Sequence, residues 1–173
     1  MRNTRVKVDK KQQKATLFYH RHGREVYTYS LRCLGRHEQA EEATQEVFLR
    51  LYRAFERDGY CEEGKERAWV MSISRNIVRD MIRLRQKKPV TVSIKAAEEV
   101  TDENRDSGFD ETVQKALDEL SENERFVVVM RHYLNMPFDE IARALDAPGG
   151  TVRSWMSRAL DKLAARLKKE LER

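Results

Sequence analysis

Four polar side chains that lie close together in the sequence, Arg153, Ser154, Ser157 and Arg158, could contact DNA. Arginine can hold a guanine edge with two hydrogen bonds or pair with a phosphate, and serine can bond to either group. The apolar residues around them recur at helical spacing and predict the buried side of one helix: Val152, Met156, Leu160 and Leu163. The four polar residues therefore fall on the outer face of that helix, near its N-terminus.

A short helix and a turn precede this face. Residues 138–145 predict a helix whose buried side holds Ile141, Ala142 and Leu145. Pro148 and the two glycines that follow it should end this helix, because glycine allows backbone angles that other residues resist, and Thr151 should cap the next helix. This spacing is typical of a helix-turn-helix, which lays its second helix in the DNA major groove. A plain helical hairpin with solvated arginines is the alternative.

The composition indicates a mostly helical protein with a polyanionic partner. Of the 173 residues, 40% are hydrophobic and 36% charged, with only 7 glycines and 3 prolines, and the formal net charge is +5. Cys33 and Cys61 lack CxxC spacing and a histidine pattern, so we expect no metal site and no cofactor. The sequence shows neither an apolar run long enough to span a membrane nor a signal peptide, so we expect a cytoplasmic protein.

Two helices are predicted after a basic arm. Residues 1–15 predict an unstructured arm, and a helix is expected over 16–34, where Gly35 stops it. A second helix is expected over 38–55, with apolar residues in one stripe: Ala40, Ala43, Val47, Leu51 and Phe55. Its other face is mainly acidic: Glu41, Glu42, Gln45, Glu46 and Leu49. That face is either a solvated surface or a docking site for a basic partner.

A third helix is predicted over 67–86, after a glycine-bearing loop at 58–65. Its core side is expected to hold Val70, Ile73, Ile77, Met81 and Leu84. A basic stripe with polar neighbours lies on its other side, and one aromatic residue lies at its start: Arg75, Arg79 and Arg83, with Asn76 and Asp80, and Trp69. Basic residues with an aromatic ring beside a loop suit an unpaired nucleic-acid strand, and a charged, solvated helix face is the alternative.

The rest of the chain predicts a linker and a second helical module. Residues 90–111 carry mainly acidic charge without apolar periodicity and predict a flexible linker. Helices are expected over 112–120 and 122–134, the second of them opened by a capping box of Ser121 and Glu124. The sequence thus predicts an all-α fold of two small helical domains, 16–89 and 112–173, joined by an acidic flexible linker.

Three stretches of this chain resemble the extracytoplasmic-function (ECF) group of bacterial RNA polymerase sigma factors. Residues 40–48 look like the segment of sigma region two that binds the clamp helices of the polymerase. Residues 67–80 look like the part that melts and recognises the minus-ten promoter element. Residues 120–163 look like sigma region four, whose helix-turn-helix recognises the minus-thirty-five element. Trp155 and Gly149 depart from the family pattern, as does the basic N-terminal arm.

The resemblance implies a role for each surface. The acidic face of the second helix would bind core RNA polymerase, and the basic stripe of the third would follow the minus-ten strand, with a flipped base held by loop 58–65. The minus-thirty-five element would be met by five residues: Thr151, Arg153, Ser154, Ser157 and Arg158. Such a protein is not an enzyme, binds promoter DNA together with polymerase, is commonly held by an anti-sigma factor, and needs no stable homo-oligomer.

One other function class fits the helix-turn-helix. A free-standing DNA-binding transcriptional regulator would have the same motif, with an N-terminal module that serves another protein. The acidic helix around Glu42 and the segment from Trp69 to Asp80 argue against that alternative, because a simple repressor requires neither. An enzyme acting on nucleic acid would require clustered carboxylates for metal, and the sequence shows none.

Overall fold

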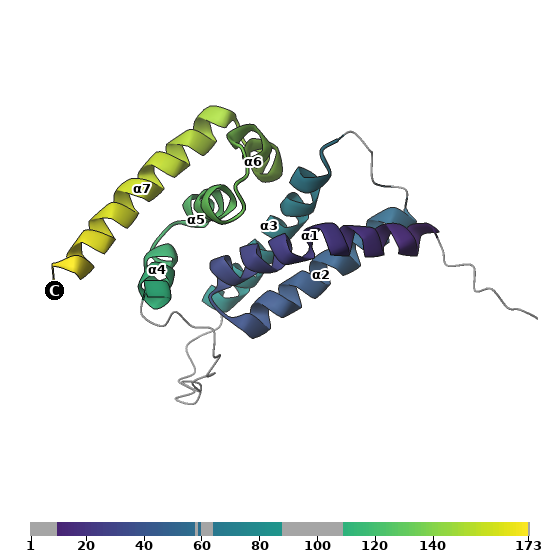
Figure 1. Cartoon of the computed structure of the whole chain (residues 1–173), viewed down its shortest axis with the longest axis horizontal. Helices are drawn as coiled ribbons and strands as arrows, with labels where there is room; N and C mark the ends of the chain where they lie inside the picture. The colour runs from purple at the N-terminus through teal and green to yellow at the C-terminus, as the bar shows by residue number, and fades with distance from the viewer. Residues whose placement is uncertain (1–9, 58, 60–63, 88–108, 173) are drawn as a thin grey trace, which may run out of the picture.

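The computed structural model describes residues 10–57, 59, 64–87 and 109–172, and every element within them is helical (Figure 1). The N-terminal helical group consists of α1 (Lys10–Leu34), α2 (His37–Glu56) and α3 (Glu66–Lys87). The C-terminal helical group consists of α4 (Phe109–Asp118), α5 (Glu122–Val128), a π-helical turn η1 (Val129–Tyr133), α6 (Phe138–Leu145) and α7 (Gly149–Leu171). The predicted all-α fold is confirmed.

Helix α1 begins earlier than the sequence predicts. The expected arm ended at residue 15, but residues 10–15 belong to α1, and residues 1–9 lie outside the described part. Two lysines fix the added turns: the Lys11 Nζ donates to the Glu56 main-chain oxygen at 2.8 Å, and the Lys14 Nζ lies 5.3 Å from the centre of the Phe55 ring. The basic residues of this segment thus bind the end of α2, a contact that helical periodicity does not reveal.

Helices α1 and α2 form a hairpin closed by Gly35. This glycine has a φ of 73°, in the left-handed region, and its N–H donates to the Leu31 oxygen at 2.8 Å. The apolar stripe predicted for α2 is confirmed, because all its members are buried: Ala40, Ala43, Val47, Leu51 and Phe55. The acidic side of α2 therefore points away from the core.

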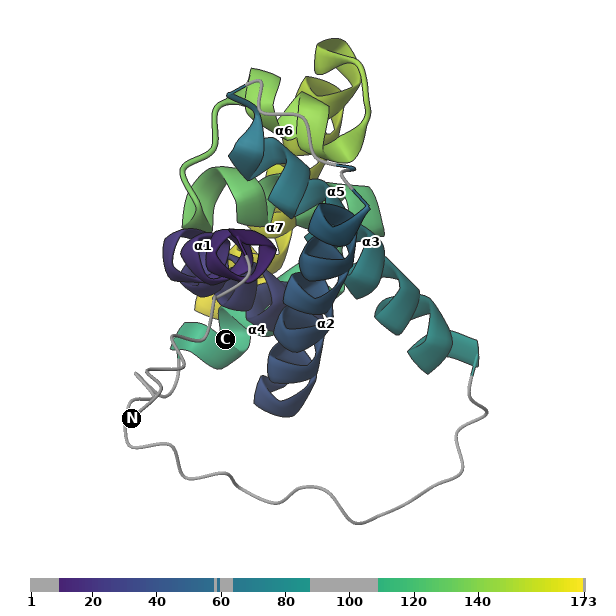
Figure 2. The same ribbon diagram turned by 90° about the vertical axis from the view of Figure 1, so that its right-hand side faces the viewer.

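Helix α3 packs on more than one neighbour, which changes its predicted core side. It contacts α1 and α2 and also α6 of the other group. Val70 and Ile77 are buried as expected, but Ile73 and Met81 are only partly buried and Leu84 is 62% exposed. Leu84 lies on the last turns of α3, which extend away from α1 and α2 (Figure 2).

The C-terminal helical group confirms the predicted capping box and corrects the helix ends. Ser121 caps α5 reciprocally with Glu124, whose carboxylate accepts from the Ser121 N–H at 3.0 Å. The single helix expected over 122–134 instead changes to the π-helical turn η1 after Val128, and Asn135 follows with a φ of 52°. Helix α4 starts at Phe109 and not at 112, while residues 90–108 of the predicted linker lie outside the described part.

Both helical groups contribute to one hydrophobic core. Buried residues of α1 to α3 and of α4 to α7 belong to a single cluster, in which the rings of Tyr29 and Phe126 lie 5.9 Å apart. Helix α6 lies against α3 in this arrangement (Figures 1 and 2). The two helical groups therefore pack directly on each other.

Candidate nucleic-acid interface

The helix-turn-helix consists of α6, a short turn and α7. Asp146 ends α6 with a φ of 49°, so the left-handed residue of the turn is an aspartate, which tolerates this region better than most side chains. Pro148 is the N-cap residue of α7, and the glycines 149 and 150 lie inside its first turn. The prediction that Thr151 caps α7 is wrong, because α7 begins two residues earlier than Thr151, where proline suits the helix start.

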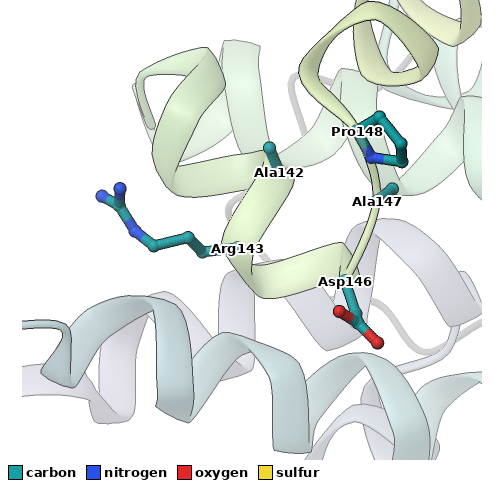
Figure 3. A pocket seen from close by; sticks show the side chains of 5 residues that line it. All are labelled: Ala142, Arg143, Asp146, Ala147 and Pro148. Carbon is teal, nitrogen blue, oxygen red and sulfur yellow. The ribbon is translucent and has the colours of Figure 1, made fainter.

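A shallow hollow of about 340 Å³ lies at this turn (Figure 3). Its lining comes from α6 and from the turn itself: Ala142, Arg143, Asp146, Ala147 and Pro148. Arg143 pairs with Asp139 on α6 at 3.2 Å. The hollow is open and mostly apolar, and it shows no nucleophile with an adjacent base.

The outer face of α7 presents its polar residues to solvent. Arg153, Ser154, Ser157 and Arg158 are all exposed, whereas Thr151 is half-buried. The inner side differs from the prediction at one position: Val152, Met156 and Ala159 are buried, and Leu160 is 46% exposed. Ala159, the smaller residue, therefore faces the core in place of Leu160.

Glu124 of α5 binds two basic residues of α7, Arg158 and Lys162. Its buried carboxylate accepts from the Lys162 Nζ at 2.7 Å and lies 3.6 Å from the Arg158 Nε. Burial alone would raise the pKa of Glu124, but the hydrogen bonds from Lys162 and from Ser121 outweigh it and lower the pKa to about 2. The sequence marks Glu124 only as a capping residue, because no local spacing reveals its link to α7.

The basic stripe of α3 faces the C-terminal helical group. The Arg75 guanidinium donates to the Leu145 main-chain oxygen at 3.0 Å and to the Asn76 Oδ1 at 2.9 Å. Arg83 pairs with Glu122 of α5 at 3.4 Å. The Arg79 Nε is buried and has no hydrogen-bond partner among the described residues. Burial, with the neighbouring Arg79 charge, lowers the pKa of Arg75.

Two further residues that were predicted to contact DNA from α3, Trp69 and Asp80, differ in exposure. Trp69 is half-buried and packs against the rings of Phe18, at 6.3 Å, and Phe55, at 5.9 Å. Asp80 is exposed. Loop residues 58 and 60–63, predicted to hold a flipped base, lie outside the described part of the chain.

The acidic face of α2 lies on the open side of the N-terminal helical group. Glu41, Glu42 and Gln45 are exposed, and Leu49 is exposed among them. Glu46 is half-buried and pairs with Arg50 at 2.8 Å. Among the described residues, none from the C-terminal helical group forms a hydrogen bond or ion pair with these side chains. The face is thus available to a partner.

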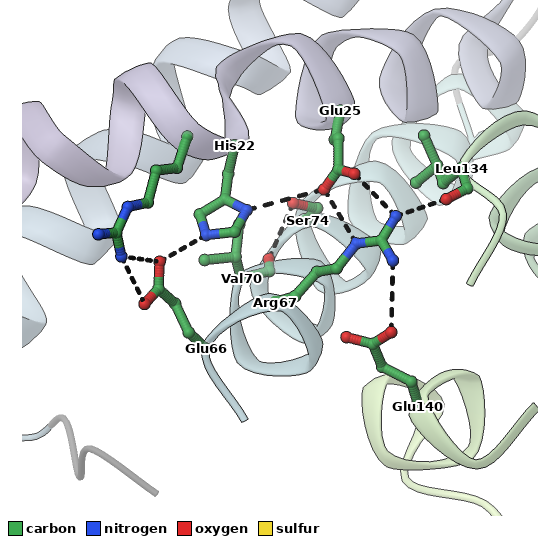
Figure 4. Close-up of polar contacts among 9 residues, drawn as sticks. His22, Glu25, Glu66, Arg67, Val70, Ser74, Leu134 and Glu140 are labelled. Atoms are coloured by element: carbon green, nitrogen blue, oxygen red, sulfur yellow. Dashed lines mark hydrogen bonds and ion pairs between the residues drawn. The ribbon is translucent and has the colours of Figure 1, made fainter. Parts of the chain in front are cut away.

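A charged network joins three helices at the start of α3 (Figure 4). Arg67 pairs with Glu25 of α1 at 2.7 Å and with Glu140 of α6 at 3.4 Å, and it also donates to the Leu134 main-chain oxygen. His22 bonds Glu66 at 2.7 Å on the other side of this network. These residues could not be found from the sequence, because they are far apart in the chain and form no spacing motif.

The network shifts two titrating groups in opposite directions. Burial alone would lower the pKa of His22, but its contacts with Glu25 and Glu66 outweigh it, so the pKa of His22 is raised. Burial alone would raise the pKa of Glu25, but hydrogen bonds with His22 and Arg67 outweigh it, so the pKa of Glu25 is lowered. The network therefore favours the charged form of each group.

The described residues form neither a metal site nor a helix that could span a membrane. None of its His, Cys, Asp and Glu side chains gather in threes in a way that could hold a metal ion. Among the same residues, no helix is both long and apolar enough to cross a membrane.

Each of the two helical groups matches a known protein family. Residues 18–88 match the family described as sigma-70 region 2, and residues 110–163 match the family described as sigma-70, region 4. The chain is 30% identical over 129 residues to the ECF RNA polymerase sigma factor SigC of Mycobacterium tuberculosis (strain CDC 1551 / Oshkosh). The aligned residues cover 73% of this chain and 69% of that protein. It is 26% identical over 159 residues to the ECF sigma factor SigW of Bacillus subtilis (strain 168), over 83% of each chain.

A solved structure shows the same fold. The sigma factor RpoE of Bartonella quintana, crystallised with the anti-sigma factor NepR, superposes with a TM-score of 0.66 at 21% identity, over 93% of this chain and 98% of that chain. Two matched regions in the expected order, together with these relatives, confirm the resemblance and set aside the free-standing regulator, which has no use for sigma region 2. The chain therefore belongs to the extracytoplasmic-function sigma factors, non-enzymatic proteins that bind RNA polymerase and direct its recognition of promoters.

Proposed function

We propose that the N-terminal part of α7 recognises the minus-thirty-five promoter element. The observation that carries this assignment is the common exposure of Arg153, Ser154, Ser157 and Arg158 on the second helix of the helix-turn-helix. This position is where such motifs contact base edges in the major groove. Thr151, half-buried at the start of the face, is placed to contact a phosphate rather than a base.

The proposal assigns the minus-ten strand to one face of α3. Three arginines recur on this face and supply guanidinium groups for phosphates: Arg75, Arg79 and Arg83. Asn76 and Asp80 lie beside them and could bond to unpaired base edges, while Trp69 supports the start of the helix through its packing on Phe18 and Phe55. Residues 16–89 would thus carry polymerase and minus-ten binding, and residues 112–173 minus-thirty-five binding.

The proposal assigns core polymerase to the acidic face of α2. Its side chains form an exposed ridge in which an apolar residue lies among acidic and polar ones: Glu41, Glu42, Gln45, Glu46 and Leu49. A basic partner surface would gain electrostatic complementarity at the rim and apolar contact at Leu49. An anti-sigma factor, a cytoplasmic location and action as a monomer belong to the same proposal.

Co-elution with bacterial core RNA polymerase tests the proposal first. The purified chain and core polymerase are run together on size exclusion at moderate salt, and genomic DNA fragments retained by the complex are sequenced. We expect a stoichiometric complex that enriches fragments sharing two spaced elements. Absence of a complex, with DNA binding by the chain alone, would contradict the assignment of α2.

A further inference from the structure

Trp155 lies on one flank of α7, between the buried side of the helix and its outer face. It shares this flank with Thr151, Arg158 and Lys162, which recur at helical spacing along α7. Ser154 lies nearer the middle of the outer face. When such a helix enters a major groove, the middle of its outer face meets base edges and its flanks meet the phosphates on either side. Trp155 is thus placed at a wall of the groove.

The ring of Trp155 is held in place while its polar hydrogen is free. Trp155 is half-buried, and its ring packs against the hydrophobic core. Among the described residues its indole N–H has no hydrogen-bond partner, and it is not one of the buried donors that lack an acceptor, so it is open to solvent. Because packing already fixes the ring, an acceptor at this point would bind without the entropic cost of ordering a long side chain.

The two cations of the same flank are directed at a protein carboxylate. The Lys162 Nζ donates to Glu124 at 2.7 Å, and the Arg158 Nε lies 3.6 Å from the same carboxylate. Trp155 therefore adds a donor that no carboxylate among the described residues holds. An indole N–H can only donate, so it requires an acceptor such as a phosphate oxygen.

We propose that the Trp155 N–H donates a hydrogen bond to a phosphate at the edge of the minus-thirty-five element, and that this contact positions α7 in the groove. The proposal rests on the assignment of α7 to that element in the proposed function. Thr151, one helical turn earlier on the same flank, would meet the same wall of the groove. The Trp155 contact conveys no base information, because phosphates are alike in every sequence. It fixes the register in which Arg153 and Ser154 meet the bases.

Two substitutions at this position test the proposal in the reconstituted polymerase complex. Trp155→Phe keeps a ring in the half-buried position and removes the N–H, and Trp155→Arg supplies a charged donor instead. The control is Tyr133→Phe, which removes the polar hydrogen of another half-buried ring in the C-terminal helical group, one that contacts Arg32 of α1. Arg153→Ala with Arg158→Ala is measured beside them as the reference for a loss of α7 contacts.

The probe is a pool of DNA duplexes with a randomised central segment, from which each complex selects its preferred sequences. Affinity for the selected duplexes is measured at several salt concentrations. We expect Trp155→Phe to bind them about tenfold more weakly, as when a hydrogen bond to a charged group is lost, with the base preferences and the salt dependence of wild type. Trp155→Arg should recover affinity at low salt and steepen the slope of log affinity against log salt concentration by about one. Tyr133→Phe should match wild type.

Ethylation of single phosphates in a selected duplex locates the contact. We expect one phosphate whose ethylation weakens binding by wild type and by Tyr133→Phe but does not weaken binding by Trp155→Phe any further. A merely structural role of the indole would lower affinity without removing the effect of any single phosphate.

Every other outcome overturns the proposal in a distinguishable way. Wild-type affinity of Trp155→Phe would show that the N–H does not meet DNA, and a changed base preference would make Trp155 a residue that recognises a base. Weaker binding with the same sensitive phosphates as wild type would show a structural role. If Arg153→Ala with Arg158→Ala also binds as wild type does, the assignment of α7 in the proposed function fails together with the proposal for Trp155.

Discussion

The Arg75 guanidinium donates a hydrogen bond to the main-chain oxygen of Leu145 across 3.0 Å. This contact ties the helix proposed to bind the minus-ten strand to the last turn of α6 in the helix-turn-helix. Asp146, the next residue, adds a favourable charge near Arg75. The left-handed end of α6 is thus both the turn of a helix-turn-helix and a partner of α3, and it links the two surfaces that we propose to bind the promoter.

Replacing Arg153 and Arg158 by alanine should weaken promoter recognition and leave polymerase binding intact. Loss of an arginine that bonds a base edge should cost about 1–3 kcal/mol of discrimination between bases. Loss of a phosphate contact should reduce the slope of log affinity against log salt concentration by about one. The measurement is promoter-fragment affinity of the reconstituted polymerase complex at several salt concentrations. Lys168→Ala with Lys169→Ala, which removes two exposed cations at the far end of α7, is the matched control and should change little. Equal loss in the control would show that only net charge matters.

Replacing Glu42 and Glu46 by lysine should abolish co-elution with core polymerase. The change puts two positive charges into the acidic face of α2, where a basic partner would be repelled. The variant should keep its helical circular dichroism, because neither side chain belongs to the buried stripe of α2. Glu119→Lys with Asp139→Lys provides the same charge change in the C-terminal helical group. Retained co-elution of the Glu42 and Glu46 variant would mean that polymerase binds another surface.

The sequence predicts the helices better than the contacts between them. The stripe of α2 and the capping box at Ser121 were predictable, because each depends on residues within one or two helical turns. Leu84 and Leu160 were wrongly placed in the core, since periodicity gives a direction and not the position of the neighbouring helix. The turn was wrong for a related reason: glycine was expected to take the left-handed angle that Asp146 takes.

The candidate site shows the same division. The exposed residues of α7 and α2 were predictable from helix faces alone. The arginines of α3 were found by spacing, but nothing in the spacing shows that α6 covers them, because Arg75 and Leu145 are distant in the chain. The ion pair between Arg67 and Glu140 could not be predicted for the same reason. Such contacts follow from tertiary packing and not from local pattern.

Glu124→Gln should remove a pH-dependent part of the stability. The folded pKa of Glu124 is lowered from 4.5 to about 2, so the carboxylate stabilises the fold above its unfolded pKa, and this contribution is lost as the pH falls through both values. The shift corresponds to about 3 kcal/mol between pH 5 and pH 2. Urea unfolding across that range should show a shallower pH dependence for the variant than for wild type.

The exposed Glu119, which pairs with Arg166, gives the control for that measurement. Glu119→Gln should follow the wild-type pH dependence closely, because an exposed ion pair contributes little. Parallel curves for wild type and Glu124→Gln would show that the Lys162 and Ser121 contacts do not lower the pKa of Glu124 in solution.

His22→Gln should flatten the stability curve on the other side of neutrality. The folded pKa of His22 is raised, because its contacts with Glu25 and Glu66 outweigh the effect of burial. A group of this kind stabilises the fold fully below its unfolded pKa, about 6.5, and the contribution is lost as the pH rises through the higher folded value. Wild type should therefore lose melting temperature between pH 6 and pH 8 more steeply than the variant does.

His132→Gln provides the comparison, because His132 is exposed on η1 and takes no part in the charged network. Its melting temperature should change with pH as that of wild type does. The network also holds Arg67, so His22→Gln tests whether the charge on His22 strengthens or weakens the hold on α6. Glu25 shares its carboxylate between His22 and Arg67, and loss of the His22 contact frees it for Arg67 alone. We therefore expect the variant to stay as compact as wild type by small-angle scattering, and an expanded variant would place His22 among the residues that hold the two helical groups together.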